Sequence, residues 1–462
     1  MGVCSVFYGL EKEDHCRDFE MSFLLLLTVV QYVLHTTAGG DMKVLLVSMD
    51  GFRNDYLTKT KTPSFDKLIA SGVTMAYMNN SFVTNTFPCH YTMATGLYPE
   101  THGILANTMY DPEFNRTFTM ANTESRWWEG GEPIWITAVK HGLQSGVYFW
   151  PGSEAAIHDR KATQWRKYNQ TVPFKERVDT VVSWLSEGKF DLGVMYFHEP
   201  DSSGHRLGPN DPNLLPVIEE MDKILEYLML TIENSGLKDK VNLIVTSDHG
   251  MTDIDLAHRV VDISRYANSS VLKSVVDQGS SSHMRPQEGK DRELVAALSG
   301  VEHLHVFLKE DIPERFHLKN NRRVMPVFAY ADEGWMITTN ATTSAQRANT
   351  SKGSHGYDNE LINMKPIFIA SGPAFKVNAT VDPIRSVDIY PLICHLLNMT
   401  GAPNNGSLYR GKTLLNSSFS EVHSSQGSTS QSVWMEASYT LVFILASLNI
   451  YIYMNPNSVI IS

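Results

Sequence analysis

Apolar runs of strand length alternate along the chain with segments of helical periodicity. Near-continuous apolar runs, which are typical of parallel strands buried on both faces, predict strands at 44–49, 192–197, 243–246 and 366–370. Apolar residues at helical spacing predict helices at 63–70, 217–237 and 387–397. This alternation predicts an α/β fold with a doubly wound, mostly parallel sheet and helices on both faces. The polar stretch 278–298 is expected to be a surface insertion.

Acidic residues follow three of the predicted strands. Asp50 and Asp248 come directly after apolar runs, and Asp201 comes four residues past one. The carboxyl ends of parallel strands meet at one edge of an open sheet, which is where ligands bind. Segments that are far apart in the sequence are therefore expected to form one site.

Histidines accompany these aspartates. The candidate metal ligands are Asp50, Asp201, His205, Asp248, His249 and His355. Each member alone has an ordinary explanation, such as a capping aspartate, a hydrophilic loop or a histidine in a glycine turn. Together, at strand ends and in glycine loops, they indicate a metal site, and carboxylate with imidazole is a ligand set that suits zinc.

Thr86, in the segment Thr-Asn-Thr-Phe-Pro at 84–88, is the candidate nucleophile. A threonine hydroxyl is a poor nucleophile at neutral pH unless a metal lowers its pKa. A surface threonine would be the plainer interpretation without the metal ligands. With them, two cations could clamp the attacking and leaving oxygens of an in-line displacement at phosphorus.

Composition and charge leave this interpretation intact. The 462-residue chain is 42% hydrophobic and 19% charged, which is ordinary for a globular protein, and its formal net charge is −11. An acidic protein is a poor general binder of nucleic acid. A small phosphate ester is not excluded, because bound cations would dominate the local field.

Both ends of the chain carry apolar segments. Residues 1–40 are interpreted as a signal peptide region, with the true start at Met1 or Met21, because the apolar run 23–33 has the length of a secretory segment. A catalytic domain is expected at 41–414, a Ser/Asn/Gln-rich stalk at 415–436, a membrane anchor at 437–455 and a short tail at 456–462. A single membrane span is preferred, and a lipid-anchor signal is the alternative. Either anchor would place the catalytic domain outside the cell.

Ten Asn-X-Ser/Thr sequons support a secreted, glycosylated domain. They are Asn79, Asn115, Asn169, Asn268, Asn340, Asn349, Asn378, Asn398, Asn405 and Asn416. Between the apolar ends the chain has two cysteines, Cys89 and Cys394. A free buried thiol is the preferred interpretation for each, and a disulfide between them is left open.

A series of short motifs resembles one known family. In order they are Asp-Gly-Phe-Arg at 50–53, Thr-Phe-Pro at 86–88, Thr-Gly-Leu-Tyr-Pro-Glu at 95–100, His-Gly-Ile at 102–104, Trp-Pro-Gly at 150–152, Asp-Ser-Ser-Gly-His at 201–205, Ser-Asp-His-Gly-Met at 247–251, Ala-Asp-Glu-Gly-Trp at 331–335 and His-Gly-Tyr-Asp-Asn at 355–359. The chain thus resembles the ecto-nucleotide pyrophosphatase/phosphodiesterases of the alkaline phosphatase superfamily, and within them the type-4 and type-5 members. The resemblance covers about residues 43–410 and implies an alkaline phosphatase-like fold.

The resemblance also implies roles for individual residues. One zinc ion would be held by Asp201, His205 and His355. The other would be held by Asp50, Asp248 and His249, with the Thr86 oxygen as a further ligand. Thr86 would form a covalent threonyl-nucleotide, Asn107 would hydrogen-bond a phosphoryl oxygen, and Phe87 and Tyr168 would stack the nucleobase. The implied activity is hydrolysis of nucleotide phosphodiester or pyrophosphate bonds, with a nucleotide or dinucleotide as substrate.

Two positions depart from the family pattern. The family usually has Lys before the nucleophile and Asn after the proline, where this chain has Asn85 and Cys89. Neither position is a metal ligand, so catalysis should persist while the preference for the leaving group differs. Choline-phospholipid phosphodiesterase activity is the alternative, and an inactive adhesion or receptor ectodomain is disfavoured because all six ligands and the nucleophile are present.

Overall fold

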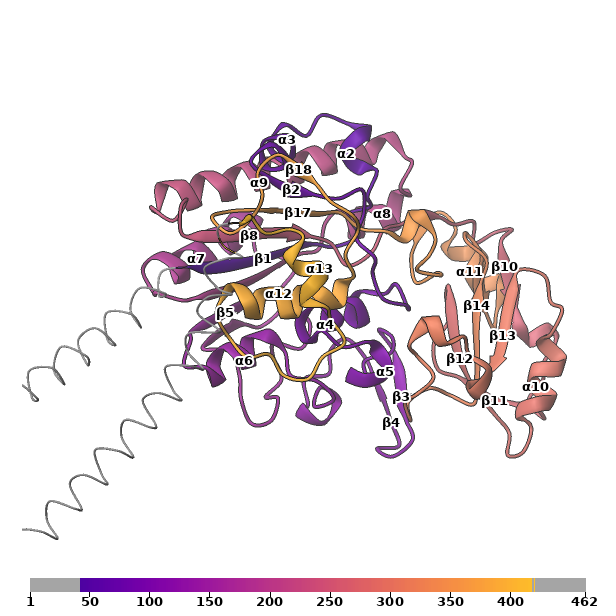
Figure 1. Cartoon of the computed structure of the whole chain (residues 1–462). Coiled ribbons are helices and arrows are strands. Elements are labelled where there is room, and N and C mark those ends of the chain that lie inside the picture. The colour runs from indigo at the N-terminus through magenta and orange to yellow at the C-terminus, as the bar shows by residue number, and fades with distance from the viewer. Residues whose placement is uncertain (1–41, 418, 420–462) are drawn as a thin grey trace, which may run out of the picture.

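An eight-stranded sheet forms the centre of the molecule (Figure 1). The computed structural model describes residues 42–417 and 419. The strands of this sheet are β1 (Lys43–Met49), β2 (Gly72–Thr74), β5 (Ser145–Tyr148), β6 (Gln164–Arg166), β7 (Leu192–Phe197), β8 (Val241–Thr246), β17 (Phe368–Ser371) and β18 (Ala379–Thr380). Their order is β18-β2-β17-β8-β1-β7-β5-β6, and β17 runs antiparallel to both of its neighbours while the other pairs are parallel. The predicted mostly parallel sheet is confirmed.

β1 lies between β7 and β8, and the three strands end nearly level. Met49 pairs with Phe197, and Ser48 pairs with Thr246. Every residue of β7 and β8 is buried, which explains why the apolar runs in the sequence are continuous. The loops that follow these three strands therefore begin at the same edge of the sheet.

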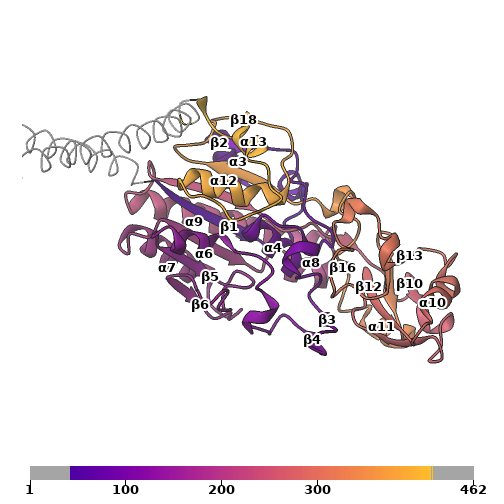
Figure 2. The same cartoon turned by 60° about the horizontal axis from the view of Figure 1, so that its bottom comes forward.

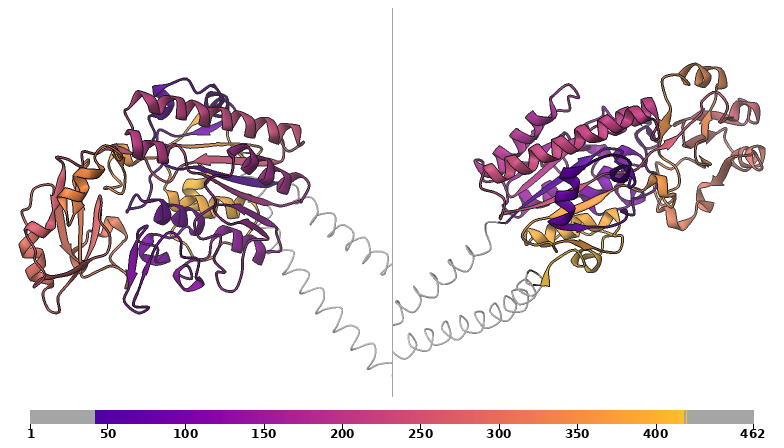
Figure 3. Two further views of the ribbon diagram at one scale, coloured as in Figure 1. Left: turned by 180° about the vertical axis from the view of Figure 1, so that it is seen from behind. Right: turned by 90° about the horizontal axis from the view of Figure 1, so that it is seen from above.

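Helices cover both faces of this sheet (Figures 1 and 3). One face carries α3 (Pro63–Ala70), α7 (Phe174–Ser186) and α9 (Leu215–Asn234), and the other carries α4 (Thr86–Thr95), α6 (Ile134–Lys140) and α12 (Ile389–Leu396). The short helices are α2 (Tyr56–Lys59), α5 (Pro99–His102), α8 (Asp201–Leu207) and α13 (Leu408–Lys412). The helix predicted at 217–237 is α9, which buries Met221, Leu225 and Leu228 on one side.

A smaller antiparallel sheet lies at one end of the main sheet (Figures 2 and 3). Its strands, in spatial order, are β11 (Leu272–Val275), β12 (Ser281–Pro286), β14 (Val327–Ala331) and β13 (Leu304–Leu308). The helix α10 (Asp291–Leu298) packs on it, and Leu294 and Leu298 share a core with Val327. The prediction of a surface insertion at 278–298 is wrong, because β12 is an interior strand whose polar residues Ser281–His283 are buried.

Three two-stranded sheets and one further helix complete the fold. The sheets are β3 (Met109–Asp111) with β4 (Arg116–Phe118), β9 (Thr252–Asp253) with β16 (Gly353–Ser354), and β10 (Val260–Asp262) with β15 (Met336–Thr338), and the helix is α11 (Ala341–Arg347). The pairing of β16 with β9 returns the chain from the smaller sheet to the end of β8. His355 follows β16 and is carried there with it.

Both ends of the described chain lie at the amino ends of the parallel strands. The Lys43 amide donates to the Lys240 carbonyl just before β8. The Asn416 amide donates to the carbonyl of Ala374, whose own amide donates to the side chain of Asn242 in β8. The two ends are therefore at the opposite side of the sheet from the predicted site.

Several predictions about the termini lie outside the described residues. These are the signal peptide region 1–40, most of the stalk 415–436, the anchor 437–455 and the tail 456–462. In the part of the chain that the structure describes, no helix is both long and apolar enough to cross a membrane. Cys89 and Cys394 are both buried with free thiols. Among the sequons, Asn79 and Asn416 are half-buried and the others are exposed.

Candidate active site

The carboxylates of Asp50, Asp201 and Asp248 meet where β1, β7 and β8 end. The Asp201 amide donates to the Asp50 carbonyl at 3.0 Å, and the Gly51 amide donates to Asp248 Oδ1 at 3.1 Å. Position 51 requires glycine here, because its φ is +65° and a Cβ would lie 2.8 Å from the Cβ of Asp201. The structure thus brings the three predicted aspartates together through their loops.

Three histidines surround these carboxylates, each with Nδ1 held by a backbone carbonyl. His205, His249 and His355 place Nδ1 at 2.8, 2.9 and 2.7 Å from the carbonyl oxygens of Gly353, Gly250 and Thr84, respectively. A neutral imidazole that donates through Nδ1 carries a lone pair on Nε2. The Nε2 atoms of His205 and His355 lie 3.1 Å apart. Such orientation by a second hydrogen bond is typical of histidines that bind metal.

One oxygen of each carboxylate accepts no hydrogen bond within the described chain. These buried oxygens are Asp50 Oδ1, Asp201 Oδ1 and Asp248 Oδ2. They face imidazole nitrogens: Asp201 Oδ1 lies 3.5 Å from His205 Nε2, and Asp248 Oδ2 lies 3.0 Å from His249 Nε2. Buried acceptors that face other acceptors are costly unless a cation lies between them. The donor set of carboxylate oxygen and imidazole nitrogen fits zinc.

The possible ligand atoms form three overlapping groups. They are Asp201 with His205 and His355, Asp50 with Asp201 and His249, and Asp50 with His90 and Asp248. The first group equals one of the two predicted ligand sets. The other predicted set, Asp50 with Asp248 and His249, is divided between the second and third groups, which share Asp50.

Burial and neighbouring charges set the protonation of the aspartates and histidines in this cluster. Burial, and then the carboxylates of Asp248 and Asp201, raises the pKa of Asp50 well above its ordinary value. Burial, and then His249 and His205, holds the pKa of His355 well below its ordinary value, so this imidazole is neutral. For His249, burial opposes protonation, but the Asp248 carboxylate outweighs it and raises the pKa. A bound divalent cation would replace such protons and ionise all three carboxylates.

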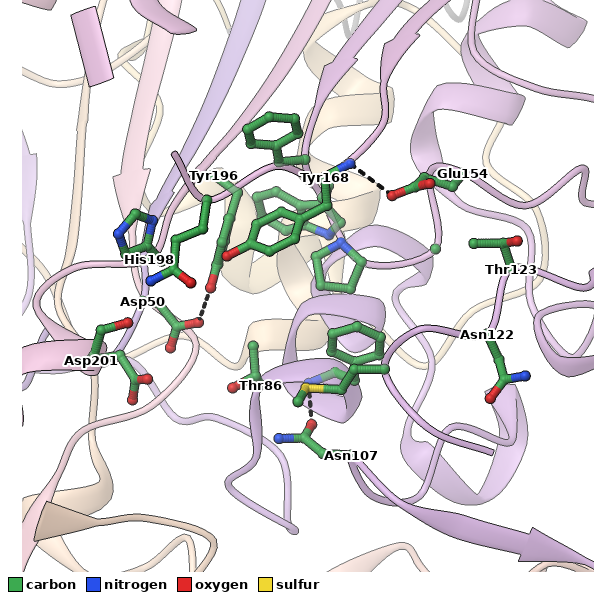
Figure 4. A pocket seen from close by; sticks show the side chains of 18 of the residues that line it. Asp50, Thr86, Asn107, Asn122, Thr123, Glu154, Tyr168, Tyr196, His198 and Asp201 are labelled. Carbon is green, nitrogen blue, oxygen red and sulfur yellow. Dashed lines mark hydrogen bonds between the residues drawn. The ribbon is translucent and has the colours of Figure 1, made fainter. Parts of the chain in front are cut away.

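Thr86 is the first residue of α4, and its hydroxyl faces these ligands. Its Oγ1 lies 3.4 Å from His249 Nε2. The amino end of this ten-residue helix carries the positive end of the helix dipole, which favours an anionic phosphate. Asn107 lies next to Thr86, and its Oδ1 accepts from the Phe87 amide at 2.9 Å (Figure 4). Its Nδ2 hydrogens therefore remain available to a ligand.

Residues 44–358 match the family described as type I phosphodiesterase/nucleotide pyrophosphatase. The chain belongs to this family. The predicted family is confirmed, and so is the predicted enzyme class, because the relatives of this phosphodiesterase are named as hydrolases. The family is metal-dependent, in agreement with the groups of ligands described above.

Relatives share most of the length of this phosphodiesterase. The chain is 43% identical over 385 residues to ectonucleotide pyrophosphatase/phosphodiesterase family member 5 of Homo sapiens, which covers 82% of this chain and 79% of the relative. It is 39% identical over 402 residues to bis(5'-adenosyl)-triphosphatase of Xenopus laevis, covering 86% and 87%. The solved structure of murine ectonucleotide pyrophosphatase/phosphodiesterase 5, an inactive threonine-to-alanine variant in complex with AMP, matches with a TM-score of 0.78 and 43% identity over 81% of this chain and 100% of that chain. The fold is therefore that of the family.

A cavity of about 420 Å³ opens beside Thr86 in this phosphodiesterase (Figure 4). Phe87 and Tyr168, which sequence analysis assigned to the nucleobase, both line it. Phe87 lies against Trp128 with ring centroids 5.9 Å apart, and Tyr168 meets Phe149 edge-on at 5.2 Å. Tyr168 is 44% exposed, so one face of its ring is available to a ligand. The cavity thus combines flat apolar walls with the polar cluster at its base.

Sequence analysis missed two residues of the site. Tyr196, at the end of β7, donates its hydroxyl to Asp50 Oδ2 at 2.6 Å. His90 lies one turn after Thr86 in α4, with Nδ1 2.8 Å from the Thr86 carbonyl and 3.3 Å from Asp248 Oδ2. The only signals for them were a phenol near the end of an apolar strand and a histidine four residues after the nucleophile.

Proposed function

We propose that this protein is an extracellular, zinc-dependent phosphodiesterase that cleaves nucleotide phosphodiester or pyrophosphate bonds and releases nucleoside 5'-monophosphate. The observation that carries the proposal is the convergence of three buried carboxylates and three oriented imidazoles beside the hydroxyl of Thr86. Two relatives support it. One is named a bis(5'-adenosyl)-triphosphatase, and the other binds AMP in a variant that lacks a threonine and is inactive.

Two zinc ions would be held by the aspartates and histidines of the cluster. Asp201, His205 and His355 would hold one, and Asp50, Asp248 and His249 the other, with Thr86 beside it. When bound, zinc supplies positive charge that lowers the pKa of a hydroxyl and stabilises negative charge on a phosphoryl group. The buried oxygens described above are suited to this role.

The side chains of the protein would carry the reaction in two displacements. Thr86 Oγ1 forms a bond to phosphorus, and the bond to the leaving group breaks with its electron pair on the departing oxygen. Water then attacks the threonyl-nucleotide, which releases the nucleoside monophosphate and restores Thr86. In both steps Nδ2 of Asn107 would donate to a phosphoryl oxygen, and Phe87 and Tyr168 would hold the base.

The test is hydrolysis of p-nitrophenyl-TMP by the secreted domain. Activity is expected to disappear with a chelator and to return with zinc. Thr86→Ala should reduce turnover by a factor on the order of a thousand while zinc content, measured by mass spectrometry, stays at the wild-type level. Thr58→Ala, at an exposed position of α2, is the matched control. Unchanged turnover in Thr86→Ala would exclude this nucleophile.

Attachment to the cell surface is a separate part of the proposal. The segment 437–455 would anchor the catalytic domain 41–414 through the stalk 415–436, and glycans would occupy the exposed sequons. Treatment of intact cells with phosphatidylinositol-specific phospholipase C distinguishes the two anchors. Retention of the enzyme indicates a peptide span, and its release indicates a lipid anchor.

A further inference from the structure

A pocket separate from the active-site cavity lies beside the half-buried sequon residue Asn79. Its volume is about 290 Å³, and we call it the sequon pocket. The residues that line it include Asn79, Tyr98, His317, Glu360, Lys365 and Arg385. No described residue lines both this pocket and the aromatic cavity beside Thr86. The volume is near the lower end of the range for small-molecule sites, about 300–1,000 Å³, so the pocket suits a single sugar residue.

A buried lysine fixes the orientation of the Asn79 side-chain amide. Lys365, which is 6% exposed, donates through Nζ to Asn79 Oδ1 at 2.9 Å. An ammonium group can only donate, so this contact identifies which end of the amide is the oxygen. Asn79 Nδ2, the other end, donates to no described residue. The nitrogen that a glycan would occupy therefore remains available, while the oxygen is held.

The backbone at Asn79 is fixed on both sides by hydrogen bonds. The Asn79 amide donates to the Ile384 carbonyl at 2.9 Å, and the Asn79 carbonyl accepts from the Ser386 amide at 2.8 Å. The next residue, Asn80, donates from Nδ2 to the carbonyl of the candidate metal ligand Asp248 at 3.2 Å. A group attached to Asn79 would thus lie on a rigid part of the fold.

The wall of the sequon pocket offers flat and polar partners to a sugar. The rings of Tyr98 and His317 are stacked, with centroids 3.9 Å apart. Arg385 Nη1 donates to the Tyr98 hydroxyl at 3.4 Å, and neither Arg385 nor Lys365 forms an ion pair with a described residue. These cations can donate to the carbonyl oxygen of an acetamido group, and the Glu360 carboxylate can accept from a sugar hydroxyl. An N-acetylated amino sugar carries both kinds of group.

Asn416, the other half-buried sequon residue, differs from Asn79. Its Nδ2 donates to the carbonyl of Pro373 at 2.8 Å and to that of Phe375 at 3.4 Å. A glycosylated amide nitrogen keeps only one hydrogen, so a glycan on Asn416 would remove at least one of these bonds. Asn79 Nδ2 has no such bond to lose.

We propose that Asn79 carries an N-linked glycan whose first sugar, N-acetylglucosamine, is seated in the sequon pocket as part of the folded domain. This inference rests on the extracellular location in the proposed function. The sugar donor is a lipid-linked oligosaccharide diphosphate. Asn79 Nδ2 bonds to C1 of the sugar and loses a proton, and the C1–O bond breaks with its electron pair on the diphosphate. Lys365 keeps its bond to Asn79 Oδ1 throughout.

Glycopeptide mass spectrometry of the secreted wild-type protein tests the modification. We expect a glycan on Asn79 and on the exposed Asn349, and none on Asn416. Peptide N-glycosidase treatment of the native protein tests the seat in the pocket. The Asn79 glycan should be released about tenfold more slowly than the Asn349 glycan, because the enzyme reaches a seated sugar only after local opening.

Thermal unfolding tests the structural role of the first sugar. Asn79→Gln removes the glycan and should lower the Tm by about 3 °C. Wild-type protein trimmed by an endoglycosidase to one N-acetylglucosamine at each sequon should keep the Tm of the untrimmed protein. Asn349→Gln, which removes a glycan at an exposed position, is the matched control and should also keep it.

The measurements on wild-type protein decide the inference even if Asn79→Gln fails to fold. An unmodified Asn79 in a protein whose Asn349 is modified would overturn it. Equal rates of release for the two glycans in the native protein would overturn the seat in the pocket. Absence of glycan from every sequon would instead contradict the extracellular location, and failure to hydrolyse p-nitrophenyl-TMP would contradict the proposed activity.

Discussion

The two larger sheets of this phosphodiesterase contribute to the site in different ways. The eight-stranded sheet provides the chemistry, since Asp50, Asp201 and Asp248 follow its central strands within a few residues. The four-stranded sheet contributes the loop 277–281 at the rim. The candidate reactive groups thus lie on short connections of the main sheet, whereas the loop 277–281 beside them belongs to the smaller sheet.

A buried ion pair joins the two-stranded sheet β3–β4 to the segment that precedes β14. Asp111 at the end of β3 accepts from Arg323 Nε at 2.7 Å, and Arg323 lies in the segment that leads into β14. The same guanidinium donates to the carbonyls of Gly103 and Trp127 at 2.6 and 3.0 Å. Arg323 therefore ties the segment before β14 to β3 and to the loops at Gly103 and Trp127.

The largest effect on activity is expected from replacing a histidine of the cluster at the end of the main sheet. His249→Ala removes an imidazole that faces both Asp248 and Thr86. Activity on p-nitrophenyl-TMP should fall by a factor on the order of a thousand, with loss of bound zinc measured by mass spectrometry. His305→Ala, on the four-stranded sheet, should keep activity within about twofold of wild type, because His305 contacts Asp332 at the surface. Equal losses in both variants would contradict the division of roles.

The next largest effect is expected at the ion pair between Asp111 and Arg323. Asp111→Asn leaves the Arg323 charge without its carboxylate partner, so we expect a loss of about 3 kcal/mol in the free energy of unfolding at pH 7. Urea unfolding measures it, with the exposed Asp239→Asn as control.

The stability difference between the wild type and Asp111→Asn should also depend on pH. Burial opposes ionisation of Asp111, but the bonds from Arg323 and Arg322 outweigh it and hold the pKa of Asp111 below its ordinary value. The stabilisation is therefore complete above the pKa of an unfolded aspartate and is lost as the pH falls through the folded pKa. The difference in stability between wild type and Asp111→Asn should narrow below about pH 4. A constant difference down to pH 2 would show that the ion pair is not its cause.

The smallest effect is expected from removing the hydrogen bond that Tyr196 donates to Asp50. Tyr196→Phe removes the hydroxyl that donates to Asp50 Oδ2 and leaves the ring in place. Zinc affinity, measured by competition with a chelator, should weaken about tenfold, as for other hydrogen bonds that orient a ligand. Tyr266→Phe, at an exposed position, should bind zinc as the wild type does.

The parts predictable from sequence were those with a strong pattern. Strands buried on both faces give continuous apolar runs, so the ends of β1, β7 and β8, and the acids after them, could be located before the structure was known. The helix α9 could be found because its apolar residues recur on one side, although its ends differ from the prediction by two or three residues.

Residues whose role depends on three-dimensional contacts could not be predicted. Tyr196 has the sequence context of a core residue, and only the structure shows its hydroxyl at Asp50. His90 is one polar residue inside a buried helix. The strand β12 begins Ser-Ser-His, a polar triplet that becomes interior because β14 pairs with it and the His283 ring packs on Phe328 with centroids 5.0 Å apart.

Both ends of the described chain lie at the amino ends of the parallel strands, far from the cavity. β1 has seven residues, so about 20 Å of strand separates Lys43 from the loop that carries Asp50. Whatever joins the domain to a surface through either end therefore attaches behind the sheet. The candidate site lies at the opposite end of these strands, so a tether attached at either end of the described chain would not start beside the cavity.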